Sequence, residues 1–478
     1  MQPRPVMRWP NVADRCVAVA TAAFVVLFGM VVVYKSALLD RPMGDLGVYL
    51  RAAWAVQTDP SQLYDCTDQN GWHYSYPPLF AILMAPLAEA PHPVGGDPIP
   101  FAVAVAVFYT FNILCLFMAV HILASALEQA SPDPAVRARP LGCQRWLRLR
   151  LMPILACLPP IGHTLMRGQT NLILLLLLCC AMAALIRGRR WLGGAALAGM
   201  ACLKIFPAYL VLYPLWRRDW RAAGGWALGL TAGLALVPAL VLGPAQTVAC
   251  YEKLAVVLVG PALNLNQDDS RAKELIEATA TDSQSFLVVI HNTLHLDQDR
   301  AHRVPTAAPT VRIAHFLLAI VFTGLTLTAA NRRRKEDGAG VVLFLGAMTV
   351  VMLASSPVCH THYFALSLPL VMGLLAREWD RVGAARLSPT LVALLSAHLL
   401  GNAAPLLPAF EVFRDAGLAL YTALGLWATA CAALWRGGVV LDHGVTPSPD
   451  SRMRSSGAIP AVALRAPAAV RSPALEPV

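Results

Sequence analysis

Long runs of apolar residues, separated by short clusters of basic residues, dominate this 478-residue chain. A run of about 20 apolar residues is long enough for a helix to cross a membrane. The pattern predicts about ten spanning helices, near residues 17–38, 102–127, 151–163, 170–186, 224–243, 311–330, 340–356, 363–376, 388–404 and 416–435. We therefore expect an all-α polytopic membrane protein.

The basic clusters indicate which loops are cytoplasmic, because such loops carry an excess of Lys and Arg. They lie at residues 137–150, 187–190, 217–221 and 332–335. Ten crossings then put both chain ends in the cytoplasm, and the first run lacks a small-residue cleavage site and is interpreted as an uncleaved span. The predicted segments are a cytoplasmic N-terminus (1–16), one catalytic membrane domain (17–436) and a disordered cytoplasmic tail (437–478).

The composition agrees with this class of protein. Hydrophobic residues make up 57% of the chain and charged residues only 14%, which excludes an ordinary soluble domain. The net charge of +10 comes from the short loop clusters, so it indicates membrane topology and no nucleic-acid partner. The 11 cysteines lie mostly in apolar segments without paired spacing and predict neither a disulfide framework nor a metal site.

One short apolar stretch, LGGAALAGMACLKIFPAYLVLYPL, lies between two cytoplasmic clusters and so predicts a hairpin. Each arm has about 12 residues, or roughly 18 Å of helix, which is too short to cross a core of about 30 Å. Lys204 then lies near the tip, inside the membrane. An ammonium group there is expected to meet an anion or a water-filled cavity, with snorkelling to water as the alternative.

Five polar segments fall on the predicted outer face, although they are far apart in the chain. They are the region of Asp45 after the first span, HYSYPP, HTLMRGQTN, TDSQSF and SSPVCHTHY. Polar groups at membrane depth are retained mainly where they line a cavity or a pathway. The outer-face loops are therefore expected to form the functional site.

Two of these segments carry groups suited to proton transfer or phosphate binding. Asp45 is a candidate general base if it is partly dehydrated at the membrane boundary, while an ordinary solvated acid is the alternative. His360 and His362 precede an apolar helix and are candidates for phosphate binding or proton transfer, or for a structural role. No companion ligands accompany them, so a zinc site is not expected.

The other segments offer candidate contacts to an anionic sugar donor. Arg167 is a candidate phosphate ligand. Gln169 and Asn171 are candidates for hydrogen bonds to sugar hydroxyls, with helix capping as the alternative for Asn171. Gln284 is a further candidate substrate contact, again with capping as the alternative.

The order of the motifs resembles a known family. An Asp-x-x-x-Tyr pattern, a later YPP, a GQxN turn, a Lys-x-x-Pro hairpin, a QS pair and an SPxxxxHY segment follow one another from about Asp45 to Pro369. Together they resemble glycosyltransferase family 87, the polyprenol-phosphate-mannose-dependent α-mannosyltransferase type of the membrane GT-C superfamily. The chain departs from the family pattern at Asp282-Ser283, before the QS pair, and in lacking a Trp before His362.

The resemblance implies a GT-C-like bundle and a hexosyltransferase whose donor is a polyprenyl-phosphate sugar, with mannose as the first guess. The implied acceptor is a glycolipid or a cell-envelope glycan. By position, Asp45 takes the general-base role in an inverting reaction, His362 lies near the donor phosphate, and Lys204 supports the anionic head group. Tyr49 and Tyr76 are assigned to the cavity wall, among the substrate contacts.

The expected location is the inner (plasma) membrane, with the site facing outside the cytoplasm. No cofactor is predicted, and a divalent metal requirement stays open. The main alternative is a transporter or lipid flippase, because broken helices and intramembrane charge are typical of both. Against it, the polar residues gather at one face, and no inverted repeat is evident.

Overall fold

A computed structural model of the chain describes residues 10–38, 44–91, 100–137, 143–262, 283–298, 302–331, 337–382 and 387–436. The chain divides into two units, residues 1–438 and 439–478, and every described residue belongs to the first unit. The predicted tail (437–478) and most of the predicted N-terminal segment lie outside the described residues.

The described part is built from helices, and its only β-pairing is two isolated bridges, Thr67 with His73 and Ser283 with His360. The long elements are α1 (Val12–Leu38), α4 (Phe101–Ala130), α6 (Gln144–Ala156), α7 (Leu158–Arg167), α8 (Asn171–Ile186), α9 (Arg190–Leu203), α11 (Trp220–Leu230), α16 (Pro309–Ala329), α17 (Gly338–Ser355), α18 (Leu368–Val382), α19 (Pro389–Ala403) and α21 (Leu418–Arg436). The predicted all-helical class is confirmed.

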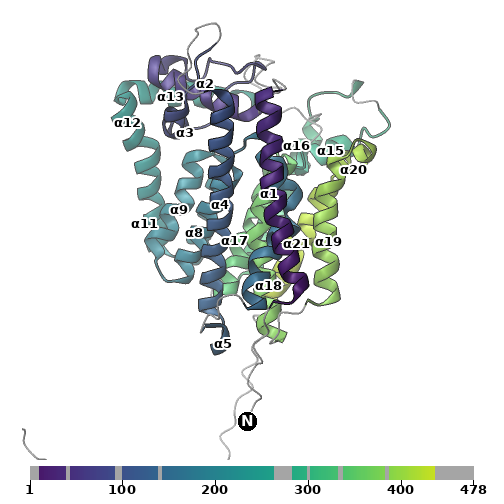
Figure 1. Ribbon diagram of the computed structural model, residues 1–478. Helices are drawn as coiled ribbons and strands as arrows, with labels where there is room; N and C mark the ends of the chain where they lie inside the picture. Colours follow the sequence, from purple (N-terminus) through teal and green to yellow (C-terminus); the bar gives the residue numbers. More distant parts are fainter. Residues whose placement is uncertain are drawn as a thin grey trace, which may run out of the picture. The chain divides into compact units, whose positions relative to one another are not determined.

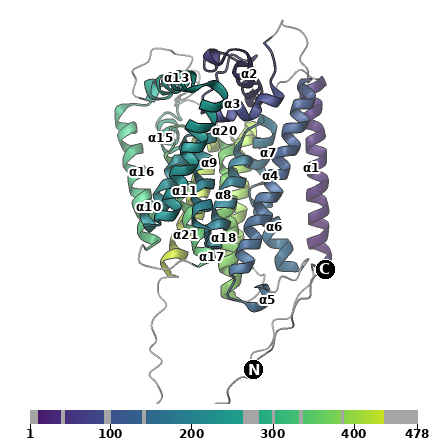
Figure 2. The ribbon, with the colours of Figure 1, turned by 90° about the vertical axis from the view of Figure 1, so that its left-hand side faces the viewer.

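Further helices lie between these elements. They are α2 (Gly44–Thr58), α3 (Pro78–Met84), α5 (Pro134–Arg137), α10 (Leu212–Arg217), α12 (Val237–Leu242), α13 (Pro244–Ala262), α15 (Phe286–Thr293) and α20 (Glu411–Asp415). Figures 1 and 2 both show α2, α3 and α13 at one end of the long helices, with α5 at the other end. We call these the α2 end and the α5 end.

The number of spans differs from the prediction. Seven described helices are long and apolar enough to cross a membrane, or eight if the bent pair of α6 and α7 is one span, against about ten predicted. The predicted spans at 170–186 and 363–376 correspond to α8, with 16 residues, and to a 3₁₀ turn followed by α18, with 15. Both helices are largely buried against other helices, so their apolar composition reflects protein packing as much as lipid contact.

Burial separates the centre of the bundle from its lipid-facing surface. Residues of α17 from Ala339 to Ala354 are all buried, so this helix is apolar all round and occupies the core. By contrast, α1 and α16 expose large apolar side chains, including Leu27 and Phe316. Such a surface is expected where helices contact lipid, and the polytopic membrane class is confirmed.

The predicted hairpin is present. The α9 helix ends at Leu203. The extended backbone of Lys204 (φ −142°, ψ 139°) breaks the helix, and a 3₁₀ segment and α10 then lead back. An ion pair of 3.3 Å between Arg190 and Asp219 closes the base of the hairpin. Lys204 therefore lies at the tip, as the spacing predicted.

Candidate active site

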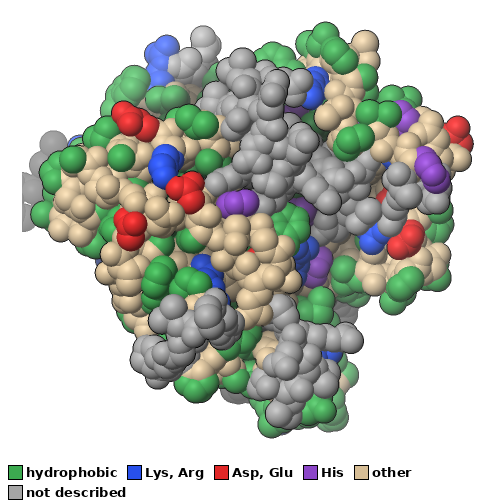
Figure 3. All heavy atoms as spheres, turned by 90° about the horizontal axis from the view of Figure 1, so that it is seen from above, with side chains coloured by type: hydrophobic (Ala, Val, Ile, Leu, Met, Phe, Trp, Pro, Cys, Tyr) green, Lys and Arg blue, Asp and Glu red, His purple; other side chains and the backbone are tan. Residues whose placement is uncertain are grey.

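Nine of the ten predicted site residues, all except Gln284, come from five parts of the chain that meet toward the α2 end. They come from the start of α2, the loop before α3, the turn between α7 and α8, the end of α9 and the 3₁₀ segment Thr361–Ser367. Figure 3 looks onto this end and shows acidic, basic and histidine side chains between apolar ones. The fold thus brings together motifs that are far apart in the sequence.

Asp45 forms an ion pair with Arg167. The carboxylate lies in the first turn of α2, and its Oδ2 accepts a hydrogen bond from Arg167 Nε at 3.1 Å. The side chains of Asp45 and Arg167 are 24% and 35% exposed, so the pair stays open to solvent or substrate. Arg167 is the last residue of α7, and Gly168 turns the chain in a left-handed conformation (φ 70°) that suits glycine.

Lys204 makes a polar contact with the turn between α7 and α8. Its Nζ donates to Gln169 Oε1 at 2.9 Å and approaches Asn171 Oδ1 at 3.5 Å. Only 2% of Lys204 is exposed, which contradicts the snorkelling alternative. Its charge interacts with that of Asp45, so the site contains one carboxylate close to two cations.

Aromatic rings surround the same ammonium group. Nζ lies 4.4 Å from the ring centre of Tyr363, 5.2 Å from that of Tyr76 and 5.9 Å from that of Phe206. Each of these rings is partly exposed. A cation is attracted to the faces of aromatic rings, and this offsets part of the cost of burying Lys204.

Tyr49 forms the inner wall on the α2 side. It is fully buried, with its hydroxyl 3.3 Å from Gln169 Oε1 and 3.4 Å from the hydroxyl of Tyr76. Its ring packs edge-on against Phe80 at 4.8 Å. Burial raises the pKa of Tyr49 well above its usual value and raises the pKa of Tyr76 in the same direction, so both phenols stay protonated.

His362 is fully buried, and neither ring nitrogen has a hydrogen-bond partner among the described residues. Its ring stacks on His360 at 5.2 Å and meets His163 edge-on at 5.2 Å. An unpaired buried polar group is costly. In a cluster that also contains cations, such a group is suited to a ligand.

The backbone of His362 is held by two side chains from α7 and α8. Thr164 Oγ1 and Asn171 Nδ2 both donate to the carbonyl oxygen of His362, at 3.1 and 3.3 Å. Asn171 is the first residue of α8, and the capping position before it belongs to Thr170, which makes no side-chain capping bond. The Asn171 side chain therefore links the Lys204 contact to the His362 segment.

Gln284 belongs to a segment that is attached to the His362 segment. Its Nε2 donates to the carbonyl oxygen of Arg414 at 2.8 Å, and Ser285 is the residue that caps α15. Ser283 is paired with His360 in an isolated bridge, which attaches this segment to the His362 segment. Asp282, noted for its departure from the family pattern, lies outside the described residues.

Three site residues were missed by the sequence reasoning. His163 contacts the hydroxyl of Thr361 at 2.9 Å, while Tyr363 and Phe206 stack on each other at 5.4 Å beside Lys204. His163 precedes Arg167 by four residues on α7, so the two share a helix face, and that spacing was available in the sequence. For Tyr363 the signal was its place at the end of the SPxxxxHY motif, and for Phe206 it was only the proximity to Lys204 in the chain.

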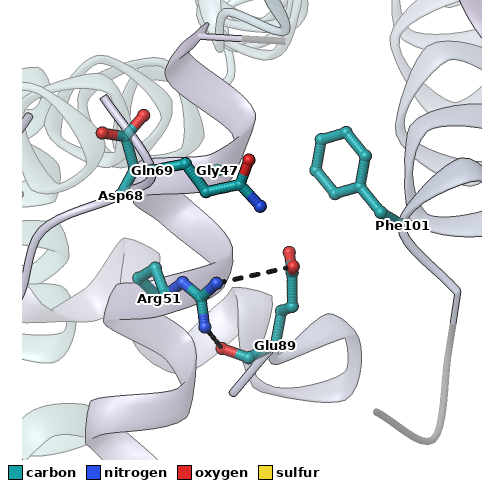
Figure 4. A pocket seen from close by; sticks show the side chains of 6 residues that line it. All are labelled: Gly47, Arg51, Asp68, Gln69, Glu89 and Phe101. Carbon is teal, nitrogen blue, oxygen red and sulfur yellow. Dashed lines mark hydrogen bonds and ion pairs between the residues drawn. The ribbon is translucent and has the colours of Figure 1, made fainter. Parts of the chain in front are cut away.

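A buried ion pair holds α2 in place next to the site. Figure 4 shows Arg51 directed toward Glu89, whose carboxylate is 3.6 Å away and whose carbonyl oxygen accepts a bond of 3.3 Å. The side chains of Arg51 and Glu89 are 6% and 8% exposed. The pair ties α2, and with it Asp45, to the segment after α3.

In the described residues no group of three or more His, Cys, Asp or Glu side chains could hold a metal ion.

The helices and the charged cluster define a polytopic membrane protein with a polar site near one end of its bundle. The family model described as "Glycosyltransferase family 87" matches residues 74–357, which is more than half of the chain. The chain belongs to glycosyltransferase family 87. This confirms the resemblance and decides for a membrane glycosyltransferase over a transporter.

Two curated proteins are similar to this chain. Each is named a polyprenol-phosphate-mannose-dependent alpha-(1-2)-phosphatidylinositol mannoside mannosyltransferase. The one from Mycobacterium tuberculosis is 27% identical over 332 residues, which cover 67% of each chain. The one from Mycolicibacterium smegmatis is 26% identical over 311 residues, which cover 63% of this chain and 61% of the relative.

Among solved structures, the chain is similar to ArnT from Cupriavidus metallidurans bound to undecaprenyl phosphate. The alignment covers 87% of this chain and 77% of that chain, with 16% identity and a TM-score of 0.32. A likeness at this level does not establish a shared arrangement of helices.

Proposed function

We propose that the protein transfers a hexose, with mannose as the first candidate, from a polyprenyl-phosphate sugar to a hydroxyl of a glycolipid or cell-envelope glycan. Family membership supports the reaction class, and the names of the two mannosyltransferase relatives support the donor. The observation that carries the proposal is the meeting of Asp45, Arg167 and Lys204 in one cluster. This arrangement supplies a base and a place for a phosphate at neighbouring positions.

In the proposed reaction, the acceptor hydroxyl oxygen attacks the anomeric carbon of the donor sugar. The bond from that carbon to the phosphate oxygen breaks, and the electron pair leaves with the polyprenyl phosphate. Asp45 takes the proton of the hydroxyl as general base, and attack opposite the leaving group inverts the anomeric centre. Negative charge grows on the phosphate during this step.

Arg167 and Lys204 are the groups proposed to stabilise that charge. Their positions are set by the turn between α7 and α8 and by the end of α9, so little rearrangement is needed during the reaction. Arg167 is partly exposed, so it can exchange its contact with Asp45 for the donor phosphate. That exchange would leave the Asp45 carboxylate free to accept a proton.

His362 is proposed as the phosphate-side histidine, with His360 beside it. The two unpaired ring nitrogens of His362 support this assignment, because a donor phosphate oxygen would satisfy one of them. Tyr49, Gln169 and Asn171 are proposed to fix the wall against which the sugar binds. Their hydrogen bonds are to Lys204, to Tyr76 and to the backbone of His362, so these three side chains would position the groups that contact the substrate.

We place the site outside the cytoplasm, in the inner (plasma) membrane. The basic residues 187–190 and 217–221 meet at the base of the hairpin through the Arg190–Asp219 pair. Lys204 and the site lie at its tip. Because basic loops stay in the cytoplasm, this arrangement favours an outward-facing site.

The test is transfer of labelled sugar from polyprenyl-phosphate mannose to extracted cell-envelope acceptors by the purified protein. Asp45→Asn keeps the size of the side chain and removes the base, and general-base catalysis is worth about 10²–10⁴-fold, so transfer should fall by that factor. The matched control is Asp59→Asn. Asp59 is an exposed acid that caps a 3₁₀ helix, and asparagine caps equally well.

Transfer by Asp45→Asn at the wild-type rate would remove Asp45 as base. Absence of transfer from every polyprenyl-phosphate sugar by a folded wild-type protein would overturn the donor assignment. Other polyprenyl-phosphate hexoses in the same assay decide whether mannose is the sugar.

A further inference from the structure

At the base of the hairpin, away from the proposed active site, the start of α9 and the start of α11 border a cavity of about 180 Å³. Its lining consists of Gly188, Arg189, Arg190, Trp191, Leu192 and Arg221. The cavity is open to its surroundings, and its volume leaves room for a phosphate group. The 14 residues of α9 separate it from Lys204 by roughly 20 Å.

The cavity carries an excess of positive charge. Arg190 is paired with Asp219, whose other carboxylate oxygen caps α11 by accepting from the Ala222 amide at 3.1 Å. Within the described ranges, no carboxylate pairs with Arg189 or Arg221, and both are exposed. Two guanidinium groups therefore line one small pocket, and guanidinium groups bind phosphate oxygens well.

Close packing of glycines fixes the shape of this surface. A Cβ atom at Gly225 would lie 2.1 Å from the carbonyl oxygen of Trp191, and one at Gly224 would lie 2.7 Å from the Trp191 ring. The helices α9 and α11 therefore meet with their backbones in contact. Because Trp191 and Arg221 are carried by these two helices, their relative position is set before any ligand binds.

Apolar side chains border the arginines on the outer surface. Trp191, Leu192 and Trp220 are 53%, 58% and 69% exposed. Tryptophan is enriched where a membrane meets water, with its ring at the level of the lipid head groups. A site for a soluble anion has no need of this apolar border, whereas a lipid brings both a phosphate and acyl chains.

We propose that this cavity binds the head group of an anionic phospholipid, with Arg189 and Arg221 contacting the phosphate and Trp191 and Leu192 contacting the start of the acyl chains. Basic pockets between membrane helices on the cytoplasmic side suit such lipids. The inference rests on the cavity, its charges and its apolar border, so it holds or fails independently of the proposed transfer reaction.

The experiment measures lipid binding to the full-length protein in detergent by native mass spectrometry, with phosphatidylglycerol, phosphatidylcholine and soluble glycerol phosphate as probes. The wild-type protein should bind one phosphatidylglycerol in preference to phosphatidylcholine, and glycerol phosphate should not displace it. Arg189→Gln with Arg221→Gln should weaken phosphatidylglycerol binding roughly 30-fold, which corresponds to about 1 kcal/mol for each arginine.

Two further variants separate this site from general attraction between basic residues and lipid. Arg381→Gln removes an exposed arginine near the end of α18, outside the cavity, and should bind as the wild type does. Arg189→Lys with Arg221→Lys keeps both charges and should retain most of the affinity. Melting curves check that each variant is folded.

Equal phosphatidylglycerol affinity in the wild type and the double glutamine variant would overturn the proposal. So would equal loss of affinity in Arg381→Gln, which would indicate charge without a site. Displacement of phosphatidylglycerol by glycerol phosphate at the same concentration would show that the ligand is a soluble anion and overturn the lipid assignment. Equal affinity for phosphatidylcholine would show that the site does not recognise the charge of the lipid.

Discussion

Replacing Lys204 by methionine tests whether a buried charge is kept for the reaction. Methionine keeps much of the length of the side chain but removes the ammonium group that donates to Gln169 and lies among the rings of Tyr76 and Tyr363. The two possible roles of Lys204, in stability and in catalysis, predict opposite results.

For catalysis, the magnitude follows from the interaction of two unit charges. At about 4 Å and an effective dielectric constant of about 20, an ammonium and an anion attract by about 4 kcal/mol. No reduction for solvent is needed, since Lys204 is only 2% exposed. If this attraction develops mainly in the transition state, Lys204→Met should slow sugar transfer by roughly 10³-fold.

For stability, the lost contacts of the ammonium group oppose the relief of its burial. Losing the hydrogen bond to Gln169 costs about 1.5–3 kcal/mol, and losing the attraction to the aromatic rings costs about 0.5–2 kcal/mol more. Removing a buried ammonium relieves a desolvation penalty of several kcal/mol. The unfolding temperature of Lys204→Met should therefore equal or exceed that of the wild type, although its activity is lost.

The assay combines single-turnover transfer from polyprenyl-phosphate mannose with thermal unfolding of the same preparation. Lys253→Met is the matched control. Lys253 is an exposed lysine on α13 that pairs with Asp65, and the transfer rate of this variant should change less than threefold. A transfer rate for Lys204→Met within tenfold of wild type would refute the catalytic reasoning. A lowered unfolding temperature with proportional loss of activity would make Lys204 a structural residue.

Two other predictions concern Tyr49 and the helix contact at Gly225. Tyr49→Phe should slow transfer about fivefold through loss of a hydrogen bond worth about 1 kcal/mol. Because burial raises the pKa of Tyr49, the wild type should lose stability through this phenol as the pH rises above about 10, and the variant should not. Parallel curves of stability against pH above that value would contradict this. Gly225→Ala should destabilise the protein by at least about 1–3 kcal/mol in denaturant unfolding, because its Cβ would meet the Trp191 carbonyl oxygen. The control Gly324→Ala, which has open space around it in α16, should be neutral or stabilising. Equal effects of the two substitutions would refute the packing argument.

Much of the fold was predictable because its signals are local. A helix that faces lipid must be apolar over its own length, so α1, α4 and α16 could be identified without reference to the rest of the chain. The hairpin was predictable because two basic clusters flank an apolar stretch too short to cross twice. Seven or eight spans in the described residues meet the length and hydropathy criteria, against about ten predicted, since an apolar run such as α8 serves equally well as a buried helix.

The candidate site was predictable as a set of segments, but their contacts were not. The sequence pointed separately to Asp45, Arg167 and Lys204 through charges at membrane depth. It did not indicate that Arg167 pairs with Asp45, or that Gln169 is engaged by the Lys204 ammonium. These contacts depend on how far each helix is rotated and how closely its neighbours approach.

The sequence by itself thus determined the class of protein, the broken helix at Lys204 and the motifs of the family, since each follows from residues close together in the chain. Only the tertiary structure decided which charges meet, that both ring nitrogens of His362 are left without a partner among the described residues, and that arginines from two helices border one cavity. The physical reason is that hydrophobic pattern and helix breaks are local properties. Pairing of distant side chains is set by the packing of whole helices.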